Sequence, residues 1–151
     1  MHGQFVIDPT VRVAVADDVD QLRLLEREAR QVLGDQRGGR RWLETHPERA
    51  AGWTAQVTED FVAVAHIGEV LVGYLAMSAA GTIARIDEVF VAPQARENGF
   101  GDALLALALE RARATGVSTL EGESLPGDRD TKNLYERAGI KARLITVSID
   151  L

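Results

Sequence analysis

The chain has 151 residues, a formal net charge of −6 and no cysteine; 46% of its residues are hydrophobic and 26% are charged. This size and balance fit one folded domain over residues 1–151, and the lack of cysteine excludes disulfides, thiolate catalysis and cysteine-bound zinc. The acidic balance argues against a nucleic-acid partner, because binding to phosphates requires clustered Lys and Arg.

The composition also predicts neither a membrane segment nor a metal site. No apolar run approaches the roughly 20 residues that span a bilayer, and the first residues lack the basic and apolar regions of a signal peptide. We therefore expect a cytoplasmic location and no membrane contact. The three histidines are scattered without metal-ligand spacing.

The first third of the chain predicts one strand and two helices. Val11–Val15 alternates apolar and other residues, as a strand does. An amphipathic helix is expected over Asp18–Leu33, and a shorter one over Arg40–Ala50. The longer helix is indicated by apolar residues at helical spacing: Val19, Leu22, Leu25 and Ala29.

The middle of the chain predicts an antiparallel meander. Phe61–Ile67 and Val70–Ser78 are rich in Val, Ala and Leu, and the intervening Gly68 signals a tight turn, so the pair predicts a β-hairpin. Thr82–Val91 gives a third strand. Pro93 ends that strand because proline lacks a ladder donor.

The last third alternates helices and strands. We predict a helix over Gly101–Thr115, a strand over Thr119–Ser124 and a helix over Arg129–Ala138. Ala142–Ile149 alternates well and predicts a closing strand. The order is β-α-α-β-β-β-α-β-α-β, an α/β fold with a mixed sheet, antiparallel central strands and helices on its faces.

The most informative stretch is Val89–Leu105, where a strand runs through a short loop into a long helix. The N–H groups at a helix start lack intrahelical partners, and the helix dipole adds positive charge there, which makes an anion site suited to phosphate. Gly99 and Gly101 allow close approach to a ligand, and Arg96 can add a guanidinium contact. A lone Gly-x-Gly pair also fits an ordinary turn, and the Rossmann and Walker patterns are not met.

Two motifs in this part of the chain carry a family resemblance. Val-Ala-Pro-Gln-Ala-Arg-Glu-Asn-Gly-Phe-Gly-Asp-Ala-Leu-Leu resembles motif A of the GNAT superfamily of N-acetyltransferases, whose Arg/Gln-x-x-Gly-x-Gly/Ala pattern is met at Arg96, Gly99 and Gly101. Asn133–Ile140 resembles the same family's motif B, with Ile140 where an aromatic is usual. The separation of the motifs and the order of elements agree with that family over nearly the whole chain.

The resemblance implies acetyl-CoA as co-substrate and direct transfer of acetyl to an amine of a small molecule, peptide or protein. Backbone groups of Val89, Phe90 and Val91 would bind the pantetheine arm, and Asn133 could contact it or only a neighbouring loop. The residues implied for the pyrophosphate are Arg96, Glu97, Asn98, Gly99, Phe100, Gly101 and Asp102.

The resemblance also implies catalytic residues. Tyr135 matches the motif B tyrosine that commonly protonates the leaving thiolate, although a helix tyrosine packed on the sheet is the alternative. Glu123 falls where the ribosomal-protein N-terminal acetyltransferases carry a catalytic glutamate. We rank Glu123 first as general base and Glu88 second, with Glu121 and Asp87 as rivals; each could instead be a solvated acidic residue.

Several alternatives stay open. The chain could be a non-catalytic acyl-CoA-binding sensor or regulatory domain, or a structural protein with a degenerate loop. Many relatives dimerise, so a homodimer is possible. Arg37–Glu44 could line an acceptor pocket, although a solvated basic turn with a packed Trp42 is slightly favoured. Asp128 stands where many members carry Asn; it can still cap a helix, but one amide contact is lost.

Overall fold

The computed structural model describes residues 8–151, which form a mixed sheet of five strands in the spatial order β1-β2-β3-β4-β5. The strands are β1 (Thr10–Val13), β2 (Phe61–Ile67), β3 (Val70–Ala80), β4 (Ile83–Val91) and β5 (Thr119–Gly122). The helices are α1 (Val19–Gly34), α2 (Gly39–Thr45), α3 (Gly52–Glu59), α4 (Phe100–Ala114) and α5 (Arg129–Arg137). None of the described helices is long and apolar enough to cross a membrane.

The sheet pairs its strands as the short connections predict. The three consecutive pairs from β1 to β4 are antiparallel. β5 pairs with β4 in parallel, after the α4 crossover. The turns of the meander are made by Gly68 (φ 58°) and Gly81 (φ 60°), a conformation that costs glycine little. The predicted mixed sheet and hairpin are therefore confirmed.

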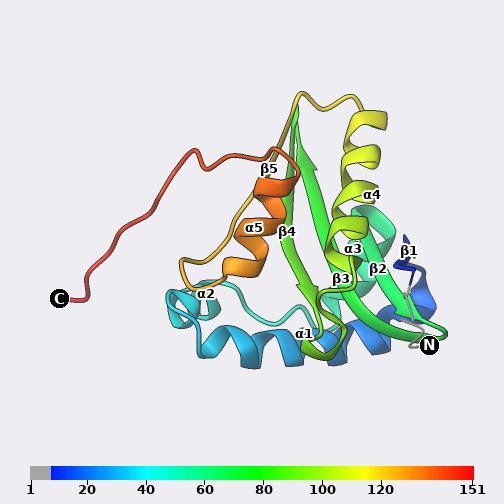
Figure 1. Cartoon of the computed structure of the whole chain (residues 1–151), viewed down its shortest axis with the longest axis horizontal. Helices are drawn as coiled ribbons and strands as arrows, with labels where there is room; N and C mark the ends of the chain where they lie inside the picture. The colour runs from blue at the N-terminus through cyan, green and yellow to red at the C-terminus, as the bar shows by residue number, and fades with distance from the viewer. Residues whose placement is uncertain (1–7) are drawn as a thin grey trace, which may run out of the picture.

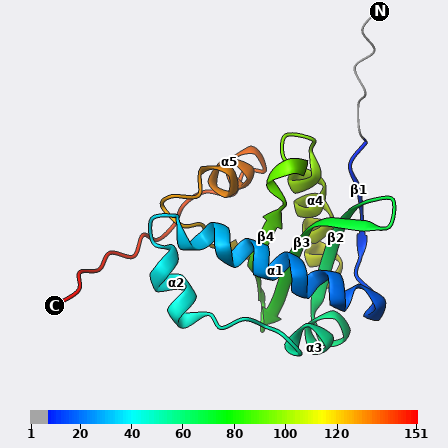
Figure 2. The same ribbon diagram turned by 90° about the horizontal axis from the view of Figure 1, so that it is seen from below.

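Two apolar layers hold the helices on opposite faces of the sheet (Figures 1 and 2). On one face, Leu22 and Leu25 of α1 and Trp53 of α3 pack against β2 and β3. On the other, Leu104 and Leu105 of α4 pack with side chains of α5. Apolar residues three or four apart in α1 and in α4 meet the sheet, as the sequence periodicity predicts.

The first third differs from the prediction in its helices. The second helix ends at Thr45 rather than at Ala50, because Pro47 disfavours a helical backbone at His46, which is extended (φ −128°, ψ 87°). α3 was not predicted. It begins at a glycine and buries only Trp53, so it has no apolar periodicity to detect.

The predicted closing strand over Ala142–Ile149 is wrong. Residues 140–151 have no regular secondary structure and are almost wholly exposed. Their alternation is that of a strand, but within residues 8–151 no strand pairs with them, and a strand requires such pairing. The strand predicted to Ser124 also ends early, at Gly122.

A bulge in β4 positions the site. Ala76 of β3 pairs with Glu88, but Met77 pairs with Ile86, so Asp87 is an extra residue. Side-chain alternation is reversed across it: Ile86 joins the core on the α4 face, whereas Glu88 contacts groups on the α1 face. The bulge lets two residues that are two positions apart, and would otherwise share a face, point to opposite sides of the sheet.

Candidate functional site

The loop between β4 and α4 has two residues with left-handed backbone. Pro93–Ala95 forms a 3₁₀ turn, after which Glu97 has φ 67° and Gly99 has φ 82°. Positive φ costs a side-chain-bearing residue such as Glu97 about 1–3 kcal/mol, so this conformation is held by its surroundings. Gly99 is the N-cap of α4 and adopts its conformation at no such cost.

Unpaired backbone donors gather at the start of α4. Within residues 8–151, the N–H groups of Gly99, Phe100, Gly101 and Asp102 donate to no carbonyl or side chain; the first helical bond runs from Ala103 N to Gly99 O at 3.0 Å. These donors and the positive end of the helix dipole lie at the place where the sequence predicts an anion site.

Arg96 lies beside these donors and is already engaged. Its Nε donates to Val91 O at 3.0 Å, and its Nη1 lies 3.3 Å from the Asp130 carboxylate. Asp130 is 74% exposed, so this ion pair is weak and can be exchanged for a contact to an anion. The guanidinium also lies 6.0 Å from the centre of the Phe90 ring.

The other loop side chains shape the backbone more than they offer new contacts. Asn98 Nδ2 donates to Ala95 O at 3.1 Å and to Arg96 O at 3.0 Å. Phe100 is 1% exposed and packs in the core, so its side chain offers a ligand no contact. Asp102 pairs with Arg137 of α5 at 3.1 Å.

β4 loses its β5 neighbour at the bulge. The parallel ladder runs from Ile83–Thr119 to Ile86–Gly122 and then stops. On the side of β4 away from β3, Asp87–Val91 has no strand partner among the described residues. This free edge, which includes Val89, Phe90 and Val91, leads directly into the loop.

Tyr135 lies beside the last residues of β5. Its hydroxyl donates to Glu123 O at 3.3 Å, and the residue is 7% exposed. A methyl group on Gly122 would stand 2.7 Å from Tyr135 Oη, so only glycine leaves room for the phenol there. Burial, with added repulsion from Asp128 and Glu123, raises the Tyr135 pKa, which keeps the hydroxyl protonated.

The carboxylates on the β5 side are open to solvent. Glu123 is 61% exposed and lies 3.9 Å from Arg85, which is also 3.5 Å from Glu121. On α5, Asn133 is exposed. Asp128 caps the helix by accepting from Thr131 N at 3.1 Å, as the sequence indicates.

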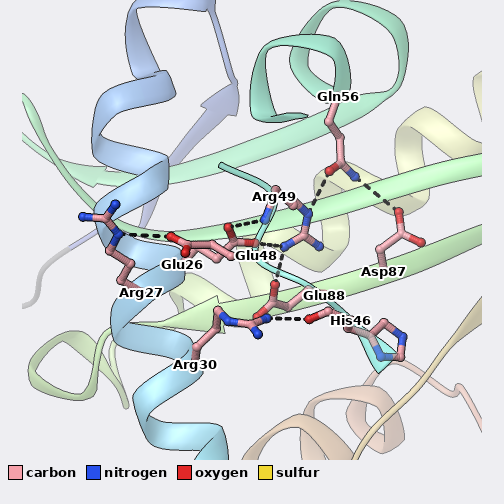
Figure 3. A network of polar contacts seen from close by, with 9 residues as sticks. All are labelled: Glu26, Arg27, Arg30, His46, Glu48, Arg49, Gln56, Asp87 and Glu88. Carbon is pink, nitrogen blue, oxygen red and sulfur yellow. Dashed lines mark hydrogen bonds and ion pairs between the residues drawn. The ribbon is translucent and has the colours of Figure 1, made fainter. Parts of the chain in front are cut away.

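Glu88 lies in a buried network on the face of the sheet that α1 covers (Figure 3). Arg49 Nη1 donates to Glu88 Oε1 at 2.7 Å and also to Glu26 Oε2, while Arg49 N donates to Glu26 Oε1 at 2.8 Å. Burial raises the Glu88 pKa, although Arg49 opposes the shift. Glu88 is therefore part of an internal ion cluster.

The network extends to Asp87 through Gln56. Gln56 accepts from Arg49 Nε at 2.9 Å and donates to Asp87 Oδ2 at 3.3 Å, while Ser78 donates to Asp87 Oδ1 at 3.1 Å. Burial raises the Asp87 pKa. The Arg49 guanidinium also stacks 4.7 Å from the Trp53 ring centre.

Glu26 and Arg49 were missed by sequence reasoning. For Glu26 a signal existed: it falls on the face of α1 that carries Leu22, Leu25 and Ala29, and a carboxylate on an apolar face requires a partner. For Arg49 there was none, because its partners come from α1, α3 and β4.

The Arg-Gly-Gly segment has a packing reason for its glycines. Gly38 has φ 87°, and a methyl group on Gly39 would overlap Leu33 O of α1. These glycines let α2 approach the end of α1 closely. Trp42 stacks on His46 with ring centres 4.2 Å apart.

Solved structures with the same fold cover nearly the whole chain. A transcriptional regulator from Bacillus halodurans is 24% identical, with a TM-score of 0.70, over 95% of this chain and 99% of its own. An aminoglycoside acetyltransferase in complex with a CoA bisubstrate analogue is 16% identical (TM-score 0.71; 95% and 99%). A ribosomal-protein-alanine N-acetyltransferase from Brucella melitensis is 14% identical (TM-score 0.72; 96% and 100%).

A search of curated protein sequences finds no match. The model of the Acetyltransferase (GNAT) family matches residues 20–140. This range contains the β4–α4 loop and the Tyr135 helix, together with every strand except β1. The chain therefore belongs to the GNAT family of acetyltransferases.

Proposed function

We propose that this chain transfers the acetyl group of acetyl-CoA directly to an amine of a small molecule, peptide or protein. One observation carries the proposal: the unpaired N–H groups of Gly99–Asp102 follow, in one continuous stretch, the free edge of β4. An anion site joined to an unpaired strand edge suits a diphosphate joined to an amide-containing arm. The names of the structural neighbours, an aminoglycoside and a ribosomal-protein acetyltransferase, support an amine acceptor.

The residues of the loop fit such a ligand. The N–H groups of Gly99–Asp102 and the Arg96 guanidinium would hold the phosphates, and the backbone of Val89–Val91 would bind the pantetheine amides. Glu97, Asn98 and Phe100 would contribute through the backbone, and the exposed Asn133 would lie near the arm. When bound, acetyl-CoA supplies the activated thioester.

Tyr135 would act as a general acid. Its phenol holds a proton at Oη, and the raised pKa keeps that proton in place at neutral pH. A thiolate leaving group is stabilised by such a donor, and general acid catalysis typically contributes about 10²–10⁴-fold to the rate. Gly122 supports this role because it leaves the space in which the phenol lies.

Glu123 is the preferred general base. Its carboxylate is 61% exposed and forms a surface pair with Arg85, while its backbone carbonyl accepts from the Tyr135 hydroxyl, so the carboxylate can take a proton from an incoming ammonium through water. Glu88 is held by Arg49 in the interior, where its carboxylate is already paired. We therefore assign Glu88 a positioning role, through Arg49, on the acceptor side of β4.

The proposal is tested by calorimetry with CoA and acetyl-CoA, followed by CoA-release assays over a panel of amines. Tyr135→Phe should lower kcat by about 10²–10⁴-fold and leave CoA affinity within about twofold, because only the proton donor is lost. Tyr74→Phe is the matched control, since it removes the same hydroxyl from the apolar layer on the opposite face of the sheet.

The outcomes separate the alternatives. No heat of binding with either CoA or acetyl-CoA would overturn the proposal. CoA binding without turnover for any amine would favour the acyl-CoA sensor instead. Equal turnover of Tyr135→Phe and Tyr74→Phe would remove Tyr135 from the mechanism.

A further inference from the structure

The β5–α5 loop, residues 123–128, links the two residues proposed for the chemistry. It begins at Glu123, whose backbone carbonyl accepts from the Tyr135 hydroxyl at 3.3 Å, and it ends at Asp128, the N-cap of α5. Its last residues form a closed turn, because Asp128 N donates to Leu125 O at 2.9 Å. The place of this turn therefore fixes the start of α5 and the point from which Tyr135 reaches β5.

The β5–α5 loop lies directly against the α1–α2 turn, residues 35–38 (Figure 1). Gly127 N donates to Arg37 O at 3.4 Å. A methyl group on Gly127 would stand 2.7 Å from Arg37 N and 3.4 Å from Arg37 Cβ. A methyl group on Gly38 would stand 3.2 Å from Pro126 Cδ. Two segments that are far apart in the sequence are thus in close backbone contact.

Gly127 is required at this contact for a steric reason. Its backbone is not left-handed, so alanine could adopt the same conformation. The obstacle to a side chain is the backbone of Arg37, which cannot turn aside as the end of a flexible side chain can. Any side chain at Gly127 must therefore push the β5–α5 loop and the α1–α2 turn apart.

The middle of the β5–α5 loop has little other support. Ser124, Pro126 and Gly127 are exposed. Within residues 8–151, the one hydrogen bond from residues 124–127 to a group outside the loop is the bond to Arg37 O. The α1–α2 turn is therefore the main contact that determines where this part of the loop lies.

We propose that the α1–α2 turn holds the β5–α5 loop in the position from which Glu123 and Tyr135 act in acetyl transfer, with Arg37 and Gly127 as positioning residues. The proposal rests on the proposed function, and it gives the Arg-Gly-Gly segment a part in that function. Both positioning residues act through their backbones: Arg37 presents its N and O atoms, and Gly127 leaves them room.

Gly127→Ala tests the proposal in steady-state kinetics with an amine that the unmodified chain acetylates. The kcat should fall about 10-fold, because a small displacement of the loop misplaces both Glu123 and Tyr135. The KM for acetyl-CoA and the CoA affinity should stay within about twofold, since the β4–α4 loop is not touched. A loss of CoA affinity equal to the loss of kcat would contradict a positioning role.

Two control variants separate the contact from its surroundings. Gly34→Ala, at the end of α1, places the same methyl group where it meets Leu43 at an ordinary 4.0 Å. Arg37→Ala removes a side chain but keeps the backbone that meets Gly127. Both should retain the kcat of the unmodified chain, and a fall in either to the level of Gly127→Ala would overturn the proposal.

A double variant shows whether the loss passes through the phenol. In the Tyr135→Phe background, Gly127→Ala should lower kcat by a smaller factor than it does in the unmodified chain, because the hydroxyl to be positioned is already absent. Equal factors in the two backgrounds would mean that the contact acts on the fold in general, and would overturn the assignment.

Nuclear magnetic resonance tests the positioning without turnover. The amide signal of Glu123 and the ring signals of Tyr135 should shift in Gly127→Ala and stay in place in Gly34→Ala. Pro126→Ala, which removes the ring that packs on Gly38, should shift the same signals by less. Unshifted Tyr135 signals in folded Gly127→Ala protein would overturn the proposal.

The failure of this proposal is distinguishable from failure of the proposed function. An unmodified chain that binds neither CoA nor acetyl-CoA overturns the function, and the positioning role falls with it. An unmodified chain that turns over an amine, with Gly127→Ala equally active, overturns the positioning role alone.

Discussion

The loop before α4 and the network around Arg49 flank the same strand, β4, but they are held by different kinds of group. The loop offers backbone N–H groups at the surface, and most of its side chains only shape it. The network joins buried side chains from α1, α3 and β4 around one guanidinium. The loop is therefore suited to gaining a ligand, whereas the network contributes to the fold.

The largest effect is expected in the network. Arg49→Met leaves Glu26 and Glu88 unpaired in the interior and should lower the free energy of unfolding by about 3–5 kcal/mol at pH 7. Urea unfolding measures the loss. CoA affinity, measured where the variant is folded, should change by less than about threefold. Arg27→Met, which removes only an exposed pair with Glu48, should cost less than about 1 kcal/mol.

The stability cost of Arg49→Met should depend on pH, and the Glu88 pKa sets the direction of that dependence. Burial raises the Glu88 pKa above its ordinary value of 4.5, so the folded protein binds this proton more tightly than the unfolded chain. The penalty of the buried carboxylate is present above the raised pKa and is relieved as the pH falls through it toward 4.5. The cost of Arg49→Met should shrink over that range. Adding Glu88→Gln should remove this part of the pH dependence.

A change in the loop should have the reverse effect of Arg49→Met, with a large loss of CoA affinity and a small loss of stability. Gly99→Val places a β-branched residue at φ 82°, which disturbs the start of α4 and should weaken CoA binding about 100-fold, or about 2.7 kcal/mol. Calorimetry measures it, and thermal unfolding should shift far less than for Arg49→Met. Gly101→Ala is the control: its methyl group would meet Leu134 at an ordinary 3.6 Å. Unchanged CoA binding by Gly99→Val would remove the loop from the site.

The smallest effect is expected at Gly122, the last residue of β5, which faces the Tyr135 phenol. Gly122→Ala would press a methyl group into Tyr135 Oη and displace the phenol, so turnover should fall about 10-fold while CoA still binds. In the Tyr135→Phe background the same change should add little, because the misplaced hydroxyl is already gone. Additive losses would show that Gly122 acts independently of the phenol.

What could be predicted from the sequence follows the same division. The β4–α4 loop, the β2–β3 hairpin and the main helices depend on residues close together in the chain, and their patterns were sufficient. The Arg49 network joins Glu26, Arg49, Gln56 and Glu88, and no local pattern brings such distant residues together. α3 was missed because Trp53 is its only buried residue.

The strand prediction for the C-terminal segment, residues 140–151, failed for a different reason. Its alternation is a correct local signal for an extended strand, but pairing depends on a neighbour that local patterns do not supply. Tyr135 was named from the motif B resemblance and Glu123 from the likeness to the ribosomal-protein N-terminal acetyltransferases. The structure brings the Tyr135 hydroxyl to the Glu123 backbone rather than to its carboxylate. Their catalytic roles remain predictions.

Directly after the bulge at Asp87, β4 connects the Arg49 network to the strand edge proposed to bind CoA. Because Glu88 and Val89 are consecutive, the groups proposed for the acceptor side and for the pantetheine arm are separated by one peptide unit. A ligand that fixes the backbone at Val89 therefore also restrains Glu88 and its ion pair with Arg49. We therefore expect CoA to slow amide hydrogen exchange in the Arg49 loop, on the face of the sheet that CoA itself does not touch.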